Sequence, residues 1–264
     1  MTVKFLFICV LSASLGINLS AATPLPSKEK LHLYLLIGQS NMEGQGKIEP
    51  MDEIPHPRVL MFDRKHQWLP AVEPVTSRAK PNGYGVGPGL AFGKFMAEKN
   101  PDVTIGLVSC AVGGTPLKRW VRGGDLYANA VKRIRIAMVD GTLAGILWHQ
   151  GEADSKVESD ATTYGDRLAK MIHDLREDLN ATNVPFVVGE IGQFNDQRTT
   201  KFTPYFHVVN DSLMKIPTHV PLTGCAESKG LTDKGDHVHF DSPSQRELGK
   251  RYAEIMLKLQ AIKP

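Results

Sequence analysis

The sequence predicts an α/β protein whose core is a parallel β-sheet covered by helices. Apolar runs rich in β-branched residues recur at residues 31–37, 59–62, 103–111, 143–148, 186–191 and 220–224, and we interpret them as strands. Segments with the apolar spacing of amphipathic helices lie between them. Strands that alternate with helices build βαβ units, and such units form a parallel sheet with helices on both faces.

Two of the predicted helices have an especially regular apolar pattern, at residues 164–179 and 248–259. Their apolar side chains recur every three or four positions, which places them on one face of each helix. These residues are Tyr164, Leu168, Met171, Ile172, Leu175 and Leu179 in the first helix, and Leu248, Tyr252, Ile255, Met256 and Leu259 in the second. A further helix is predicted at residues 90–99, after a Pro/Gly-rich loop at residues 81–89.

The first residues of the chain have the pattern of an export signal. Lys4 precedes an apolar run at residues 5–15, and Ser20, Ala21 and Ala22 are the small residues that cleavage requires. A buried first strand or a membrane anchor are the alternatives, but the run is shorter than the ~18 apolar residues of a membrane-spanning helix. We expect a signal peptide at residues 1–22, a single domain at residues 23–264, and a secreted or periplasmic protein without membrane association after cleavage.

The composition is that of a globular protein, with 42% apolar and 22% charged residues. The formal net charge is +3, and no basic run is interleaved with aromatic residues, so the electrostatic pattern of nucleic-acid binding is missing. The spacing Gly85-x-Gly87-x-Gly89 is similar to part of a phosphate-binding loop, but no predicted strand directly precedes it. We therefore predict no nucleic-acid partner, and neither a cofactor nor a metal ion.

The cysteines leave one question open. Cys9 lies in the predicted signal, so Cys110 and Cys225 remain in the mature chain. Export would permit a disulfide between them, but two cysteines do not make a disulfide framework. Unpaired, buried thiols are the favoured interpretation.

A serine in the setting of a nucleophile follows the first predicted strand. Ser40 lies between glycines in the segment GQSNMEG at residues 38–44. An isolated serine of this kind is more often a turn or helix-cap residue, so a second feature is needed. Near the C-terminus, Asp236 stands three residues before His239. Because a serine hydroxyl needs a base and that base needs an orienting carboxylate, these three residues are candidates for a catalytic triad.

The same C-terminal segment allows a different interpretation. His237 and His239 alternate along the chain, and Asp236 or Asp241 would complete a set of metal ligands. A strong metal-binding spacing such as H-E-x-x-H is missing, however. A metal-dependent deacetylase therefore remains an alternative to the serine enzyme.

Two other predicted strands end in polar segments that a core does not require. Gly113-Gly114-Thr115 follows the run at residues 103–111, and its small residues allow backbone N–H groups to approach a reacting oxygen. HQGEAD at residues 149–154 follows the run at residues 143–148, and the Gln150 amide is a side-chain donor. Donors of this kind stabilise the oxyanion of acyl transfer.

Five segments, in order along the chain, resemble the motifs of one known group of enzymes: GQSNMEGQG, GVGPGLAFG, CAVGGT, WHQGEAD and DHVHF. They are similar to those of sialate O-acetylesterases and acetylxylan esterases, a group of SGNH hydrolases in which the acetylxylan esterases form carbohydrate esterase family six. The segments span residues 38–240. The resemblance implies a three-layer α/β/α, flavodoxin-like domain with the site above its central parallel sheet.

The resemblance also implies roles for individual residues. Ser40 would be the nucleophile and His239 its base. The oxyanion donors would be the backbone N–H groups of Ser40 and Gly114 together with the Gln150 side chain, in place of the asparagine of many SGNH enzymes. Gln39 stands where many relatives carry aspartate.

The acid of the site has two candidates. Asp236 fits the usual Asp-x-x-His arrangement, but the resemblance places Glu152 in the same cleft, and some members of the group rely on that glutamate. Proximity in the chain favours Asp236, because one tight turn brings its carboxylate to the His239 ring.

The resemblance implies an acetylated carbohydrate as the substrate. No segment offers a long apolar tunnel for an acyl chain, and the short chain favours an acetylxylan esterase-like enzyme over a sialate O-acetylesterase. A non-catalytic carbohydrate-binding relative is a further alternative, which an intact nucleophile and base disfavour. The candidate substrate contacts are Gln39, Asn41, Tyr84, Arg119 and Trp120.

Overall fold

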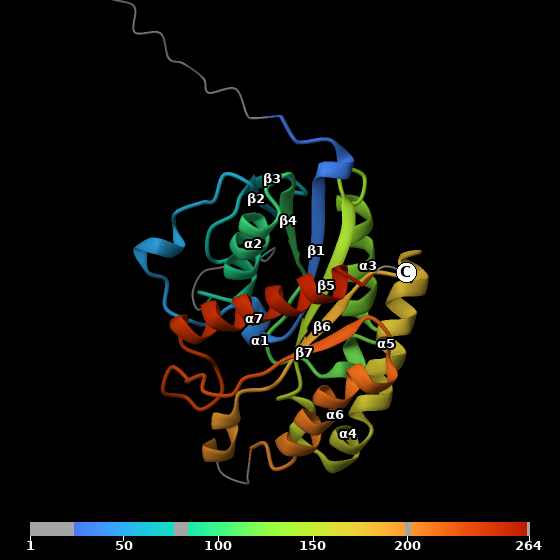
Figure 1. The fold of residues 1–264 in the computed structure, drawn as a ribbon. Coiled ribbons are helices and arrows are strands. Elements are labelled where there is room, and N and C mark those ends of the chain that lie inside the picture. Colours follow the sequence, from blue (N-terminus) through green and yellow to red (C-terminus); the bar gives the residue numbers. More distant parts are fainter. Residues whose placement is uncertain (1–23, 77–83, 199–201, 263–264) are drawn as a thin grey trace, which may run out of the picture.

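The computed structural model describes residues 24–76, 84–198 and 202–262 of the chain (Figure 1). Seven strands form one sheet in the order β3-β2-β4-β1-β5-β6-β7. All neighbours pair in parallel except β2 and β3. The strands are β1 (Leu31–Gly38), β2 (Val59–Phe62), β3 (Trp68–Pro70), β4 (Thr104–Ser109), β5 (Thr142–His149), β6 (Phe186–Gly189) and β7 (Thr223–Ala226).

All six predicted strands are present, within a few residues of their predicted ends. The short strand β3 was not predicted. It pairs antiparallel with β2 at the edge of the sheet, where its Pro70 is tolerated because an edge strand does not need every N–H. β2 and β3 form a hairpin at the edge of the sheet. When the other five strands are numbered in chain order, their order in the sheet, β4-β1-β5-β6-β7, becomes 2-1-3-4-5, which is the order of a flavodoxin-like sheet.

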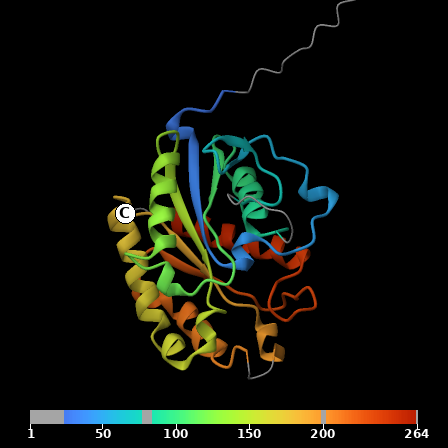
Figure 2. The same ribbon diagram turned by 180° about the vertical axis from the view of Figure 1, so that it is seen from behind.

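Helices cover both faces of the sheet, which confirms the predicted three-layer architecture. One layer contains α2 and α7, which lie in front of the sheet in Figure 1. The other layer contains α3, α5 and α6 on the opposite face, which Figure 2 shows from behind. The helices are α1 (Ser40–Glu43), α2 (Pro88–Lys99), α3 (Asp125–Ala137), α4 (Glu158–Thr162), α5 (Tyr164–Asp178), α6 (Phe206–His219) and α7 (Ser242–Gln260).

The alternation of side chains along β1 explains why there are two cores. Leu33 and Leu35 pack into the apolar cluster beneath α3, α5 and α6, whereas Tyr34 and Leu36 pack into the cluster beneath α2 and α7. Successive residues of a strand point to opposite faces, so a central strand must be apolar throughout. This is why β1 appears in the sequence as a continuous apolar run.

The two cysteines of the described chain are both free, as favoured above. Cys110 directly follows β4 and Cys225 lies in β7, four strand spacings away in the sheet. At ~4.8 Å per spacing this separation is about 19 Å, well beyond the ~7 Å between Cα atoms that a disulfide can span. Burial raises the pKa of each thiol to about 12, so neither is a reactive thiolate.

Within the described part of the chain, no helix combines the length and the apolar character needed to cross a membrane. The predicted signal peptide at residues 1–22 lies outside the described residues. Its boundary and the single domain at residues 23–264 therefore stay predictions.

Candidate active site

The candidate site lies where the chain changes direction across the sheet. After β1 the chain forms β2, β3 and β4, all on one side of β1, and it then crosses to β5 on the other side. Ligands of doubly wound sheets bind beyond the carboxyl ends of the strands at such a switch point. Gly38 brings the ends of β1 and β5 together, because a Cβ on this residue would lie only 2.1 Å from the carbonyl oxygen of His149. Its φ of 135° also requires glycine.

Three predicted residues form a continuous hydrogen-bonded series at this edge. Ser40 begins α1 directly after β1, and its Oγ lies 2.9 Å from Nε2 of His239. The other ring nitrogen of His239, Nδ1, lies 2.6 Å from Oδ2 of Asp236. An ionised carboxylate only accepts, so Nδ1 carries a proton and Nε2 is left to accept the proton of Ser40. Nucleophile, base and acid thus have the geometry of a serine hydrolase triad.

Asp236 is held in its ionised form by the turn that it shares with His239. Burial alone raises its pKa, but the backbone N–H and the ring of His239 and the backbone N–H of Val238 donate to the carboxylate and lower the pKa to about 2. The two backbone N–H groups, of His239 and Val238, donate to Oδ1 over 2.8 and 3.0 Å. The carboxylate is therefore fixed in orientation before any substrate arrives.

Glu152, the second candidate acid, holds a different position. Its Oε1 accepts from Nδ2 of Asn41 over 2.7 Å, and its buried side chain lines the same cavity as Ser40 and His239. The two ring nitrogens of His239 already face Ser40 and Asp236. The ring has no nitrogen left for Glu152, so the geometry favours Asp236 as the orienting acid.

Asn41 is a structural residue rather than a substrate contact, and this prediction is wrong. It is fully buried. Besides Glu152, its Nδ2 donates to the carbonyl oxygen of Val238 over 2.9 Å, and its Oδ1 accepts from the N–H of Phe240 over 3.1 Å. These two hydrogen bonds hold the residues on either side of His239, so Asn41 positions the His239 ring relative to Ser40.

Two backbone N–H groups, of Ser40 and Gly114, are the predicted oxyanion donors and lie at the edge of the sheet beside the Ser40 side chain. Ser40 is the first residue of α1, where an N–H has no helical partner, and Gly114 lies in an exposed turn with φ of 70°. In the described residues neither N–H donates to a protein acceptor. The turn is close to the nucleophile, because a Cβ on Gly113 would lie 3.5 Å from Cβ of Ser40. These groups are suited to bind an oxyanion.

Sequence reasoning missed Glu43, which holds this turn in place. The buried Glu43 carboxylate accepts from the backbone N–H of Gly113 over 2.9 Å. Glu43 stands three residues after Ser40, one helical turn away, and this spacing was the signal that could have revealed it.

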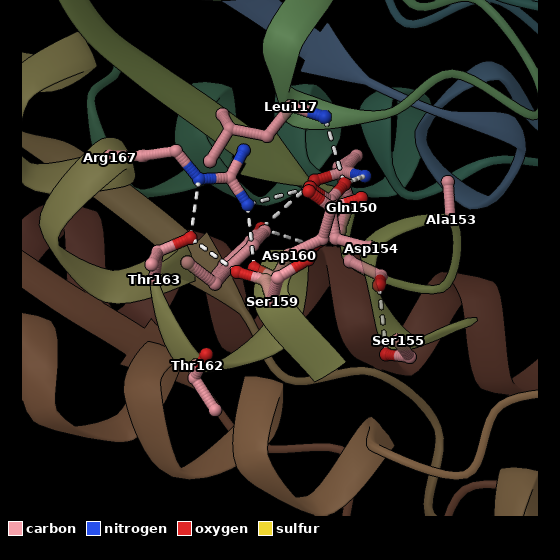
Figure 3. Close-up of polar contacts among 12 residues, drawn as sticks. Leu117, Gln150, Ala153, Asp154, Ser155, Ser159, Asp160, Thr162, Thr163 and Arg167 are labelled. Atoms are coloured by element: carbon pink, nitrogen blue, oxygen red, sulfur yellow. Dashed lines mark hydrogen bonds and ion pairs between the residues drawn. The ribbon is translucent and has the colours of Figure 1, made fainter. Parts of the chain in front are cut away.

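Gln150 does not occupy the predicted place in the oxyanion hole. Its side chain has 0% exposure and does not line the cavity at Ser40. Its Nε2 donates to Oδ2 of Asp154 over 2.7 Å (Figure 3). The same Nε2 also faces the carbonyl oxygen of Thr115 and Oε1 of Gln39, at 3.1 and 3.2 Å. Its two amide hydrogens are therefore used inside the protein, and the prediction that it donates to the oxyanion is wrong.

The predicted substrate contacts are divided by the structure. Trp120 is only 1% exposed, packs edge-on against Trp148 and donates to Oγ1 of Thr115, so the prediction that it contacts sugar is wrong. Arg119 pairs with Asp125 and does not line the cavity at Ser40. Tyr84, which is partly exposed, does not line this cavity either, whereas Gln39 does.

The residues of the alternative metal site do not converge. Asp241 caps α7 by accepting from the N–H of Ser244 over 2.8 Å, and Nδ1 of His239 is held by Asp236. His237 instead lies beside Asp233, with 3.5 Å between Nδ1 and Oδ2. Contacts within the protein therefore account for the positions of Asp241, His239 and His237 without a metal ion.

The series of Asp236, His239 and Ser40 opens into a cavity of about 300 Å³. Its size suits a small acyl group with an open side for the alcohol. The lining residues are Gln39, Ser40, Gln45, Gly113, Gly114, Glu152, Ala153, Lys156, Val238 and His239.

The three-layer fold and the motifs at the carboxyl edge of its sheet define an SGNH-like hydrolase. The chain belongs to the carbohydrate esterases described as sialic acid-specific acetylesterases, whose family profile matches residues 30–258. A similar curated protein is a probable carbohydrate esterase of Arabidopsis thaliana, 30% identical over 89% of this chain and 92% of that protein.

Solved structures extend this comparison. The X-ray structure of the Arabidopsis thaliana protein has a TM-score of 0.78, with 88% of this chain and 99% of the other covered. NanS, at 19% identity, has a TM-score of 0.72 over 89% of this chain and 98% of its own. A carbohydrate acetylesterase from Xanthomonas citri, at 22% identity, has a TM-score of 0.63 over 84% of this chain and 55% of its own. The last two likenesses establish the shared fold.

Proposed function

We propose that this chain is a secreted serine O-acetylesterase that removes acetyl groups from a plant-type or other polysaccharide or oligosaccharide, in the manner of an acetylxylan esterase. The observation that supports the mechanism is the unbroken series from Asp236 through His239 to Oγ of Ser40 at a small open cavity. The carbohydrate esterase family supports an acetylated carbohydrate as the substrate.

The proposed reaction has two halves. Oγ of Ser40 attacks the acetyl carbonyl carbon while its proton passes to Nε2 of His239, and the oxyanion is stabilised by the N–H groups of Ser40 and Gly114. The intermediate collapses when the sugar oxygen leaves and takes the proton from His239. Water then attacks the acetyl-enzyme with His239 again as base, which releases acetate and restores the Ser40 hydroxyl. No cofactor takes part in these steps.

Replacement of the nucleophile and the base tests the mechanism. We expect Ser40→Ala and His239→Ala each to lower kcat for p-nitrophenyl acetate by at least about 10³-fold, and the double variant to lose little more, because the two residues act as one unit. The enzyme is treated with a chelator throughout, so that a metal-dependent route is silenced. If Ser40→Ala kept more than about a tenth of the activity, the serine mechanism would be wrong. A carbohydrate-binding relative without catalysis would show no saturable hydrolysis at all.

A sialate O-acetylesterase is the second candidate, because Lys156 lines the cavity beside Glu152 and Ala153. An ammonium group there can attract the carboxylate of an acidic sugar, which a neutral xylan lacks. Acetate release from acetylated xylan, acetylated mannan, pectin and O-acetyl sialic acid distinguishes the candidates. If the acidic substrates are preferred, Lys156→Met should lower kcat/KM for these and leave it unchanged for p-nitrophenyl acetate. Equal rates on the neutral and acidic sugars would remove the argument from Lys156.

A further inference from the structure

We propose that the side-chain amide of Gln39, the residue directly before the nucleophile, is the third donor of the oxyanion hole, in the role first expected of Gln150. The inference rests on the proposed serine mechanism, since only that mechanism forms an oxyanion beside Ser40. It adds to that mechanism a donor that acts on the transition state and not on the bound substrate.

The contacts of Gln39 fix which end of its amide faces the cavity. Its Oε1 lies 3.3 Å from the backbone N–H of Ala153, which can only donate, and 3.2 Å from Nε2 of Gln150. The carbonyl oxygen of the amide is therefore turned toward these two donors. Because oxygen and nitrogen lie on opposite sides of an amide group, Nε2 points away from Ala153 and Gln150.

The Nε2 atom of Gln39 has no acceptor among the described residues. The side chain nevertheless lines the cavity together with Ser40, Gly113 and Gly114. Only 3% of Gln39 is exposed, so the amide is largely sheltered from bulk water. Nε2 of Gln39 is not among the fully buried polar atoms of the described residues that lack a partner, so it is open to the cavity, where an oxyanion formed beside Ser40 can accept from it.

A buried chain of polar groups prevents the Gln39 amide from turning over. The fully buried Asp154 accepts from Nε2 of Gln150 and from the backbone N–H of Leu117 through Oδ2, and from Arg167 through Oδ1 (Figure 3). Were the Gln150 amide reversed, its oxygen would face the Asp154 carboxylate. Gln150 therefore presents a donor to Gln39, which must present its oxygen in return.

The other end of the Gln150 amide lies beside the hydroxyl of Tyr164. The hydroxyl of Tyr164 lies 3.0 Å from Oε1 of Gln150 and receives the N–H of Trp148 over 3.0 Å. The single proton of the Tyr164 hydroxyl has a closer acceptor in the backbone carbonyl oxygen of Gln150, at 2.7 Å, so the orientation of the Gln150 amide rests on Asp154. Buried Gln150 is thus a positioning residue, and Gln39 is the residue that reaches the reacting atoms.

Replacement of a single donor separates catalysis from structure. Gln39→Glu keeps an acceptor oxygen for Ala153 and Gln150 but loses Nε2, and Gln39→Met removes the amide without adding a charge. We expect each variant to lower kcat by about 10²–10³-fold with KM changed less than about threefold, as for other single oxyanion donors. Gln45→Glu, at another glutamine that lines the cavity, is the matched control for the charge that Gln39→Glu introduces.

Binding of methylboronic acid supplies a second readout, because it forms a tetrahedral adduct on a catalytic serine. We expect its inhibition constant to rise in the Gln39 variants by the same factor as kcat falls, since both depend on the oxyanion contact. Thermal unfolding of each variant shows whether the fold is intact. A purely structural role would lower kcat and the unfolding temperature without this proportional loss of boronate affinity.

The outcomes distinguish this inference from the proposed function. If both Gln39 variants kept kcat within about fivefold of the wild type while Ser40→Ala was inactive, Gln39 would not be a donor and the serine mechanism would stand. Loss of kcat with unchanged boronate affinity would equally overturn the inference. If Ser40→Ala itself remained active, the proposed function and the role of Gln39 would both be wrong.

Discussion

Replacement of Asp236 by asparagine tests the order of the two acids most directly. Oδ1 of Asp236 accepts two backbone N–H groups, those of Val238 and His239, while Oδ2 accepts Nδ1 of His239 over 2.6 Å. An asparagine would keep its oxygen toward the two N–H groups, which places its NH₂ group against Nδ1. Two donors cannot face each other, so the ring would carry its proton on Nε2 and could no longer accept the proton of Ser40.

A loss of the correct tautomer costs about 10⁴-fold in kcat, or about 5 kcal/mol of transition-state stabilisation. Glu152→Gln is the matched comparison, because a glutamine retains the oxygen that accepts from Asn41 over 2.7 Å. We expect a loss of at most about 10²-fold there, since a charge is removed but no tautomer is changed.

The assay for this pair is steady-state hydrolysis of p-nitrophenyl acetate, with the residual rate of Ser40→Ala subtracted and the fold verified by circular dichroism. The reasoning is refuted if Glu152→Gln is the more damaging change. In that case the glutamate orients His239 in the active form, and the short contact with Asp236 serves only the structure of the turn.

Three other predictions concern stability and processing. Burial raises the pKa of Glu73 to about 8 from 4.5, so the contribution of this residue to stability should be fully present below pH 4.5 and be lost as the pH rises to about 8. Thermal unfolding across that range should show a smaller decline in Glu73→Gln than in the wild type. Trp120→Ala should lower the free energy of unfolding in urea by about 3–5 kcal/mol, because a large buried side chain is lost. Trp120→Phe should leave KM for acetylated xylan unchanged, and a higher KM would show that Trp120 contacts the sugar after all. N-terminal sequencing of protein secreted by its native host should give a start near Ala22 or Thr23, and retention of Met1 would contradict the signal peptide.

The features that the sequence predicted correctly are local in the chain. The strands are visible because a strand covered on both faces must be apolar along its whole length, as β1 is. Asp236 and His239 are close enough in sequence that one turn decides their contact. Ser40 became a candidate because it follows such a strand between glycines and because Asp236 and His239 offer the base and carboxylate that a nucleophilic serine needs.

The orientation and burial of side chains that meet from different strands were decided only by the tertiary structure. Gln39 and Gln150 are the same residue type at the ends of neighbouring strands, and no pattern in the chain reveals which amide points into the cavity. Asp154 decides it, because its carboxylate accepts from Nε2 of Gln150 over 2.7 Å and so fixes which end of that amide faces Gln39. Trp120 was misassigned for the same reason, since its burial depends on Trp148 from another strand. The sequence by itself thus determined the fold and the candidates for nucleophile and base, whereas the packing of distant segments determined the orientation of the groups around them.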